Sequence, residues 1–190
     1  ELRDGELLLI DAGCELHGYA SDITRTFPVN GRFSGAQRDV YELVLAAQRA
    51  AMAKVRAKNA WNEPHDAAVR ELAQGMIDLK LLPGPLEAVL AKEGYKRFYM
   101  HRTGHWLGLD VHDAGDYKRS GQWRALVPGM TLTVEPGIYI RAAADVPEAL
   151  RDVGVRIEDD VLVTEGDCEV LTAAAPKSVA DIEALMRSAH

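Results

Sequence analysis

Residues 10–26, IDAGCELHGYASDITRT, decide the fold, because they predict two paired strands that each carry an aspartate. The first strand, residues 6–12, ends its apolar run at Asp11. The second, residues 18–27, carries Asp22 among polar and β-branched neighbours. A carboxylate in a protein core is costly unless it is paired, and otherwise it stays protonated. We therefore expect Asp11 and Asp22 to share a cationic partner.

The composition is that of a chain that can bury one sizeable core, so we predict one domain over residues 1–190. The formal net charge of -7 gives no reason to expect a nucleic-acid partner, whose binding sites are basic. No apolar run approaches the ~20 residues of a membrane span, and no signal-peptide pattern opens the chain. We predict a cytoplasmic protein without a membrane partner. The two cysteines, Cys14 and Cys168, are too few for a disulfide framework and are predicted to be free thiols.

Capping residues and apolar periodicity predict the helices. Ser34 is a suitable N-cap for a helix that reaches about residue 58, and a second helix is predicted over residues 64–82. Proline and glycine at 83–85 end that helix, and a short third helix follows over 86–93. Ser178 and Asp181 form a capping box for a closing helix over 179–188. His65, in the first turn of the second helix, is predicted to be a solvated surface histidine.

Two late segments are predicted to be strands that also carry acids. Residues 130–140, MTLTVEPGIYI, have an apolar strand pattern that Glu135 interrupts just before a proline and a glycine. Residues 153–164 alternate, and they follow a loop at 141–152 that we expect to be exposed. One face of this strand would carry Val155, Ile157 and Asp159, and the other Arg156, Glu158 and Asp160. A solvated charged face is an alternative explanation. Two such β-units facing each other would bring four acids together.

Three histidines gather between residues 98 and 115, FYMHRTGHWLGLDVHDAG, although the whole chain has six. This segment also holds three glycines and has no helical period, which favours a loop. A loop that concentrates imidazoles is more often a functional site than a fold element. We therefore interpret His101, His105 and His112 as candidate site residues.

Four acids, Asp11, Asp22, Glu135 and Glu158, together with one histidine predict a metal site. Like charges at close range raise one another's pKa, so four ionised carboxylates need cations. Two divalent ions would balance the four charges. Oxygen-rich ligation with one imidazole favours manganese, with cobalt or zinc also possible. Two ions roughly 3.5–4 Å apart would share a hydroxide and polarise a carbonyl, which predicts metal-assisted hydrolysis.

The motifs give the chain a resemblance to a known family. It resembles the proline-specific aminopeptidases (Xaa-Pro aminopeptidase, aminopeptidase P) of peptidase family M24. Their catalytic domain has the pita-bread fold, which is also found in methionine aminopeptidase and prolidase. IDAG, GYASDITRTFPVNG, HWLGLDVHD, LTVEPGIY and RIEDDVLVT occur in order, so the resemblance covers nearly the whole chain. It implies an α+β, pita-bread domain and a dinuclear metalloaminopeptidase.

The resemblance also implies a substrate and a role for each site residue. The substrate is a peptide with proline at position two, cleaved at its first bond by attack of a metal-bridging hydroxide. The metal ligands would be Asp11, Asp22, His105, Glu135 and Glu158, with Asp22 and Glu158 bridging the two ions. Glu135 would accept a proton from the attacking water, and His112 would stabilise the tetrahedral intermediate. His101 would lie farther out in the pocket, Arg156 would hold a ligand carboxylate, and Tyr139 is a further supporting candidate.

The chain departs from the family pattern at its beginning. It starts at Glu1 without a methionine and enters a strand almost at once, which favours a piece of a longer protein. Family members carry an N-terminal domain, then opening helices and a strand with a further pocket histidine, before the point where this chain starts. We therefore expect a catalytic domain truncated at its N-terminal side, an isolated chain that lacks activity, and a homo-oligomer only in the full-length protein.

Four alternative interpretations of the sequence compete with this one. Prolidase, which acts only on dipeptides, shares the ligand set. Methionine aminopeptidase fits HWLGLDVHD and RTFPVNG less well. A creatinase-like hydrolase keeps the fold without the ions, and metal-free pita-bread domains serve as binding modules. The five intact candidate ligands disfavour the last two.

Overall fold

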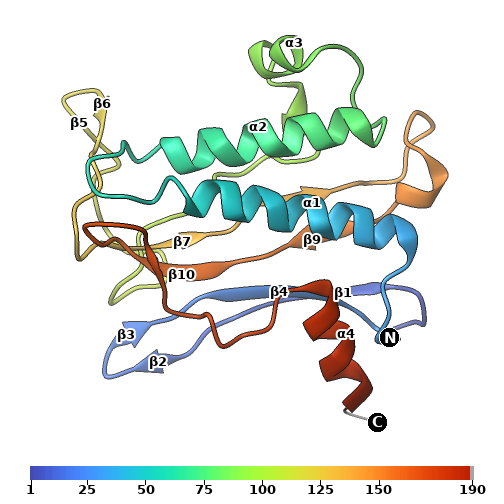
Figure 1. Cartoon of the computed structure of the whole chain (residues 1–190), viewed down its shortest axis with the longest axis horizontal. Coiled ribbons are helices and arrows are strands. Elements are labelled where there is room, and N and C mark those ends of the chain that lie inside the picture. The colour runs from blue at the N-terminus through green and yellow to red at the C-terminus, as the bar shows by residue number, and fades with distance from the viewer. Residues whose placement is uncertain (189–190) are drawn as a thin grey trace.

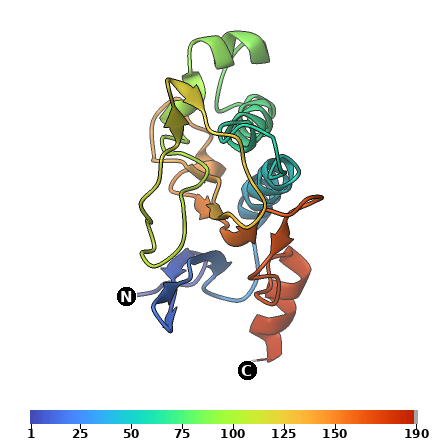
Figure 2. The ribbon, with the colours of Figure 1, turned by 90° about the vertical axis from the view of Figure 1, so that its left-hand side faces the viewer.

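Two long helices lie side by side and cover one side of the strands that carry the predicted site (Figure 1). They are α1 (Gly35–Met52) and α2 (Glu63–Asp78) in the computed structural model, which describes residues 1–188. Above α2 lie the short helix α3 (Leu86–Ala91) and the 3₁₀ turn η1 (Gly94–Arg97). Figure 2 shows the histidine-rich segment and the chain after it on the opposite side of the strands from the two helices.

Both long helices begin near their predicted starts and end earlier than predicted. The N-cap Ser34 accepts a hydrogen bond from the backbone of Gln37 and forms a capping box with it. The predicted extensions to residues 58 and 82 are wrong, because α1 ends at Met52 and α2 at Asp78. Lys58 and Lys80 adopt left-handed φ angles of 75° and 60°, which a helix cannot contain. Ser178 caps the closing helix α4 (Val179–Ser188) as predicted, because its Oγ accepts from the Asp181 backbone N–H and donates to Asp181 Oδ2, a side-chain pairing in place of the second bond of a capping box.

The first β-unit is the predicted strand pair, divided by a short hairpin. β1 (Leu7–Ala12) pairs antiparallel with β4 (Ile23–Pro28), and Asp11 lies opposite Thr24. Between them, β2 (Glu15–Leu16) and β3 (Tyr19–Ala20) form the hairpin. Gly13 is required here, because a Cβ at this position would lie 1.7 Å from the Ser21 carbonyl oxygen. The predicted strand 18–27 is therefore interrupted just before Asp22.

The second β-unit consists of two strands that are both broken, where the sequence predicted two continuous ones. The first comprises β7 (Thr131–Val134) and β8 (Gly137–Tyr139), and the second comprises β9 (Gly154–Arg156) and β10 (Asp159–Leu162). β7 pairs with β10 and β8 pairs with β9. Pro136 has no N–H to donate to a ladder, so the first strand breaks beside Glu135. The second strand breaks beside Glu158, directly opposite the break in the first strand.

Short strands complete the sheets, and every pairing in the described part of the chain is antiparallel. β5 (Lys118–Arg119) pairs with β6 (Gln122–Trp123), and β11 (Glu169–Val170) pairs with β10. Helices packed on one face of antiparallel strands confirm the predicted α+β class. Over residues 1–188, no helix has the length and apolarity that crossing a membrane would need.

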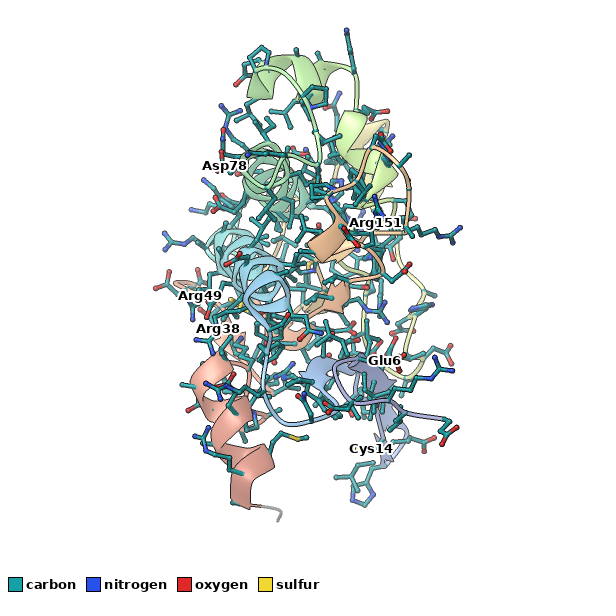
Figure 3. All side chains as sticks on the ribbon, turned by 90° about the vertical axis from the view of Figure 1, so that its right-hand side faces the viewer. Glu6, Cys14, Arg38, Arg49, Asp78 and Arg151 are labelled. Atoms are coloured by element: carbon teal, nitrogen blue, oxygen red, sulfur yellow. The ribbon has the colours of Figure 1, made fainter. Side chains whose placement is uncertain are left out.

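The core lies between the helices and the second β-unit. From α1 and α2 it takes Val40, Val44, Ala51, Leu72 and Met76, all with no exposed surface. The loop at 141–152 is mostly exposed, as predicted, but it contains the 3₁₀ turn η2 (Glu148–Leu150) and buries two of its side chains, Val146 and Leu150. These two side chains join the main cluster, because their apolar surface is removed from water there. Figure 3 shows Arg38, Arg49 and Asp78 along the outer side of the helices.

We expect Leu72→Ala to destabilise the fold by about 2–5 kcal/mol, because it leaves a cavity in a close-packed core. The matched control is Leu185→Ala on α4, whose side chain is 56% exposed. That change should alter stability by less than about 0.5 kcal/mol. Urea unfolding followed by circular dichroism measures both. Equal losses in the two variants would contradict the placement of the core.

Candidate metal centre

The predicted acids and histidine meet at one place although five separate segments supply them. Asp11 is the next-to-last residue of β1, and Asp22 immediately precedes β4. His105 belongs to the histidine-rich loop. Glu135 and Glu158 occupy the two strand breaks. His105 Nε2 lies 3.4 Å from Asp22 Oδ2 and 3.6 Å from Glu135 Oε1. The structure thus brings together all five candidate ligands.

Three overlapping sets of ligand atoms describe this cluster. Within each set, one atom from every residue lies within 4.8 Å of the others. The sets are Asp11–Asp22–Glu158, His105–Glu135–Glu158 and Asp22–His105–His112. Asp22, Glu158 and His105 each occur in two sets, and Asp22 and Glu158 are the two residues that share a set with Asp11 and also a set with His105. The donors are mostly carboxylate oxygens with imidazole, a combination that suits hard or borderline divalent ions.

The loop around His105 fixes the orientation of its ring. Nδ1 lies 2.9 Å from the Trp106 carbonyl oxygen, which can only accept, so Nδ1 carries the proton and Nε2 presents a lone pair to the acids. The loop backbone is held against β7, because the His105 N–H donates to Thr133 Oγ1 at 3.1 Å. This approach requires Gly104, where a Cβ would lie 2.0 Å from the Thr133 carbonyl oxygen. The loop therefore holds His105 with its Nε2 directed at the acids.

Burial and mutual repulsion raise the pKa values of Asp22, Glu135 and Glu158. Burial, followed by the nearby charge of Glu135, raises the pKa of Glu158 to about 8. Burial raises the pKa of Glu135 to about 7, and the neighbouring Asp22 contributes. The pKa of Asp22 is also raised, by burial first and then by Asp11. In the part of the chain that the structure describes, Arg156 is the only lysine or arginine in an ion pair with any of the four acids. This excess of negative charge fits divalent cations.

Arg156 links three groups at the edge of the cluster. Its Nη2 donates to Asp11 Oδ2 at 2.6 Å, its Nε to Thr24 Oγ1 at 3.2 Å and its Nη1 to the Tyr139 hydroxyl at 3.0 Å. The Tyr139 hydroxyl in turn lies 2.8 Å from His101 Nε2. Because Arg156 holds Tyr139 and Asp11 at once, it orients a candidate ligand and the tyrosine together.

The other two candidate histidines lie at different depths. His112 is exposed, and its ring centre lies 4.1 Å from that of His105, edge to face. His101 is half-buried, and burial lowers its pKa. Its Nδ1 lies 4.0 Å from Glu135 Oε2, too far for a hydrogen bond. Both histidines therefore border the acid cluster without being held in it as tightly as His105.

Most of these groups line one cleft of about 860 Å³, while Asp22 and Glu158 are buried beside them in the acid cluster. The acids and histidines form one part of its lining, and aromatic and basic side chains form the rest. Lys118 Nζ lies 4.1 Å from the ring centre of Trp123, and the Arg102 guanidinium lies 5.0 Å from the same centre. The aromatic and basic lining comprises Trp61, Arg102, Tyr117, Lys118 and Trp123. An amphipathic surface of this kind suits a peptide-sized ligand.

The sequence alone missed the side chains that hold the ligands. Thr24 Oγ1 donates to Glu158 Oε2 at 2.5 Å, and Asp160 Oδ2 accepts from the Asp22 backbone N–H at 3.0 Å. Glu158, Asp159 and Asp160 are all buried, so the alternative of a solvated charged face at 153–164 is wrong. One signal for Thr24 was available in the sequence. Thr24 lies two residues beyond Asp22, and residues two apart in a strand share a face. No local pattern identified the cleft tryptophans.

His65 is not the solvated histidine that its position predicted. It is half-buried, and its Nδ1 lies 2.8 Å from Thr103 Oγ1. Burial lowers its pKa to about 4, so the imidazole is neutral near pH 7. The Thr103 carbonyl oxygen accepts from the Glu135 backbone N–H at 2.7 Å. His65 therefore packs behind the site rather than facing solvent.

The fold and the acid cluster together define the class of protein, a metallopeptidase-type domain. The chain belongs to metallopeptidase family M24, because the model of that family matches residues 1–165. The comparison confirms the family resemblance that the sequence motifs indicated.

Similar proteins share both the sequence and the fold. A Xaa-Pro aminopeptidase of Haemophilus influenzae is 54% identical over 97% of the chain, which covers 43% of that protein. The structure of the aminopeptidase PepP of Pseudomonas aeruginosa superposes with a TM-score of 0.97 at 57% identity. That match covers 99% of this chain and 43% of the other. A zinc-substituted Escherichia coli aminopeptidase P with bound product gives a TM-score of 0.95 at 48% identity, over 100% of this chain and 43% of that one.

These matches confirm the predicted pita-bread fold. The chain spans about 43% of the length of the relatives that it matches. The activity and substrates of a whole protein of that kind are therefore a matter for proposal.

We expect the metal-free protein to lose stability as the pH rises from about 6.5 to about 8, a window above the ordinary pKa of histidine, so that histidines such as His65 with lowered pKa values do not oppose the trend. Glu135 and Glu158 have an ordinary pKa of 4.5, which folding raises to about 7 and about 8. In this window the folded state holds protons that the unfolded state has released, so each rise in pH favours unfolding. Thermal unfolding of chelator-treated protein across these pH values, at constant ionic strength, measures the decline in Tm.

Glu158→Gln should flatten this decline, because it removes one of the two titrating groups. The control is Glu71→Gln on the exposed side of α2, which should leave the slope unchanged. A Tm that rises with pH over the same window would contradict the electrostatic description of the cluster.

Proposed function

We propose that the full-length protein is a metal-dependent aminopeptidase that cleaves the bond between an N-terminal residue and a following proline. The observation that carries this proposal is the convergence of Asp11, Asp22, His105, Glu135 and Glu158 in one cluster, of which Asp11, His105 and Glu135 line the cleft. The Xaa-Pro aminopeptidases of similar sequence support the substrate class. The specificity for proline rests on those relatives, since no single contact in the cleft defines it.

The acid cluster fits two divalent metal ions better than one. Asp22 and Glu158 share one ligand set with Asp11, and each also belongs to a set with His105. This placement supports their role as bridging ligands, with Asp11 at one end and His105 and Glu135 at the other. Manganese is the proposed metal, because carboxylate oxygens dominate the donors, and cobalt or zinc could also bind. The related E. coli enzyme has been obtained in a zinc-substituted form.

When bound, the two ions would lower the pKa of a water molecule and polarise the carbonyl group under attack. The protein must then accept the proton of that water. Glu135 suits this role, because burial raises its pKa to about 7 and a general base is most effective near the working pH. After proton transfer, Glu135 can return the proton to the leaving nitrogen of proline. Thr133 Oγ1, 3.4 Å from Glu135 Oε1, makes a weak contact that leaves the carboxylate free to exchange a proton.

The histidines outside the acid cluster would act on the substrate. His112 is exposed in the cleft beside His105, so it can donate a hydrogen bond to the oxygen that becomes negative during attack. His101 and Tyr139 form a hydrogen-bonded pair that Arg156 anchors at the other edge. This pair would shape the pocket for the residue before the scissile bond. The aromatic side chains of Trp61 and Trp123 offer apolar surface for proline, whose nitrogen has no hydrogen to satisfy.

The proposal also covers the setting of the enzyme. We propose a cytoplasmic location, which the two free thiols support, since such thiols are typical of reducing compartments. An N-terminal domain and a homo-oligomeric assembly of the full-length protein rest on the family resemblance. Peptides are the proposed partners, and the acidic net charge of -7 supports no nucleic-acid partner.

We expect elemental analysis of manganese-loaded chain to find about two ions per molecule. Bound metal should also raise the Tm, because it binds only the folded state. Asp22→Asn and Glu158→Gln should abolish both effects, since each removes a bridging ligand. Asp39→Asn, an exposed position on α1, is the control and should keep two ions. Retention of two ions by Asp22→Asn would exclude its bridging role, and no metal in the parent chain would refute the proposal.

We expect the full-length protein, loaded with manganese, to release arginine from Arg-Pro-Pro and to leave Gly-Pro largely intact. The cleft of about 860 Å³ extends well beyond the acid cluster and can accept residues after the proline. Initial rates with the two peptides, and with Arg-Ala-Ala as a control for proline specificity, provide the measurement. Faster cleavage of Gly-Pro would favour a prolidase, and equal rates with Arg-Ala-Ala would remove the proline requirement.

A further inference from the structure

A second polar cluster lies behind the strands that carry Glu135 and Glu158, and the proposed chemistry does not use it. It comes from α1, β4, β10 and the segment before α4, and we call it the back cluster. Its members are Gln48, Arg25, Asp159, Thr172 and Lys177. Gln48 and Asp159 have no exposed surface. Glu158 and Asp159 are consecutive residues of an extended chain, so their side chains point to opposite sides, Glu158 to the acid cluster and Asp159 to α1.

Asp159 is the centre of the back cluster, and four donors surround its carboxylate. Lys177 Nζ lies 2.6 Å and Gln48 Nε2 3.0 Å from Oδ2, while Thr172 Oγ1 lies 2.7 Å and Arg25 Nη2 2.8 Å from Oδ1. A buried carboxylate with this many partners is fixed in place, because moving it would break several charge-assisted bonds. Asp159 therefore provides a rigid point directly behind Glu158.

Gln48 connects this point to both strand breaks. Its Nε2 also lies 3.3 Å from the carbonyl oxygen of Val134 and 3.3 Å from that of Ile157. Val134 immediately precedes Glu135, and Ile157 immediately precedes Glu158. One amide group thus bridges the two main-chain positions from which the two glutamates extend. Figure 3 shows the next residue, Arg49, on the outer side of α1, consistent with a helix that turns Gln48 inward.

Arg25 makes the corresponding connection to the first β-unit. Its Nη1 donates to the Glu158 carbonyl oxygen at 2.6 Å and to the Thr24 carbonyl oxygen at 2.9 Å. Thr24 is the residue whose hydroxyl holds Glu158 Oε2. The guanidinium therefore fixes the main chain of the ligand and of the residue that orients it, while its Nη2 remains on Asp159.

We propose that Gln48, Arg25 and Asp159 are positioning residues that set the spacing of Glu135 and Glu158 before any metal binds. This inference rests on the metal centre of the proposed function. The strand ladders cannot supply the spacing by themselves, because both are interrupted where the two glutamates occur. Groups behind metal ligands commonly tune affinity by holding those ligands in place. The back cluster does so through main-chain carbonyl groups rather than through the ligand side chains.

The test measures manganese binding to the metal-free chain of 190 residues, by calorimetry at a temperature where every variant is folded. Gln48→Leu keeps the approximate volume and removes the amide that joins the Val134 and Ile157 carbonyl groups. We expect its manganese dissociation constant to rise by about 10-fold to 100-fold. The matched control is Tyr41→Phe, because Tyr41 is buried on the same helix and its hydroxyl donates only to the Lys177 carbonyl oxygen, at 2.9 Å. Both variants should lower the Tm, and only Gln48→Leu should weaken manganese binding.

Unchanged affinity in folded Gln48→Leu would overturn the inference, as would an equal loss of affinity in Tyr41→Phe. If Gln48→Leu does not fold, Arg25→Lys replaces it, since lysine keeps the charge on Asp159 and cannot also reach both carbonyl groups. Arg25→Lys should then show the same loss, and unchanged affinity would overturn the inference. Failure of the parent chain to bind manganese would refute the metal centre itself, whereas equal binding by parent and variant refutes only the positioning role.

Discussion

The structure depends on holding four carboxylates together against their mutual repulsion. Within residues 1–188, Asp11 is the only one of the four acids in an ion pair with a lysine or arginine, the guanidinium of Arg156. Glu158 is held by the hydroxyl of Thr24, a neutral donor, and burial raises the pKa of both glutamates. Acids that were free to move would separate, so the fold must hold each of them on a different element. Repulsion between fixed groups is what makes the cluster a receptor for divalent cations.

The two strand breaks explain how a sheet can present such a cluster. An unbroken antiparallel ladder would direct alternate residues to opposite faces at fixed intervals. At Glu135 and Glu158 the ladders stop and resume with different partners, β7 with β10 and β8 with β9. Both glutamates therefore leave the sheet at the same level, beside Asp22 and His105. The strand ends at these breaks need other hydrogen-bond partners. The Gln48 side chain reaches the carbonyl oxygens of Val134 and Ile157, and the Thr103 carbonyl oxygen accepts from the Glu135 N–H.

The sequence pointed to acids that the structure brings together, because acids inside apolar strands are rare enough to notice. Asp11, Glu135 and Glu158 each interrupt a β pattern, and His105 belongs to a dense histidine segment. The predicted helix ends were wrong. Lys58 and Lys80 have a left-handed backbone, which lysine as a residue type does not indicate. The prediction that His65 is solvated was wrong, because its burial involves contact with Thr103, which is distant in sequence. Thr24 and Gln48 act only through tertiary contacts, so no spacing rule could identify their partners.

The back cluster differs in charge from the acid cluster in front of it. The back cluster holds two cations, Arg25 and Lys177, against the single carboxylate of Asp159, so it places a net positive charge behind the four acids. Arg25 donates to the main-chain carbonyl oxygen of Glu158 at 2.6 Å, and Gln48 reaches the carbonyl oxygens of the residues that precede both glutamates. Support from the back cluster therefore acts on the main chain and leaves the carboxylate oxygen atoms of the two glutamates within the acid cluster.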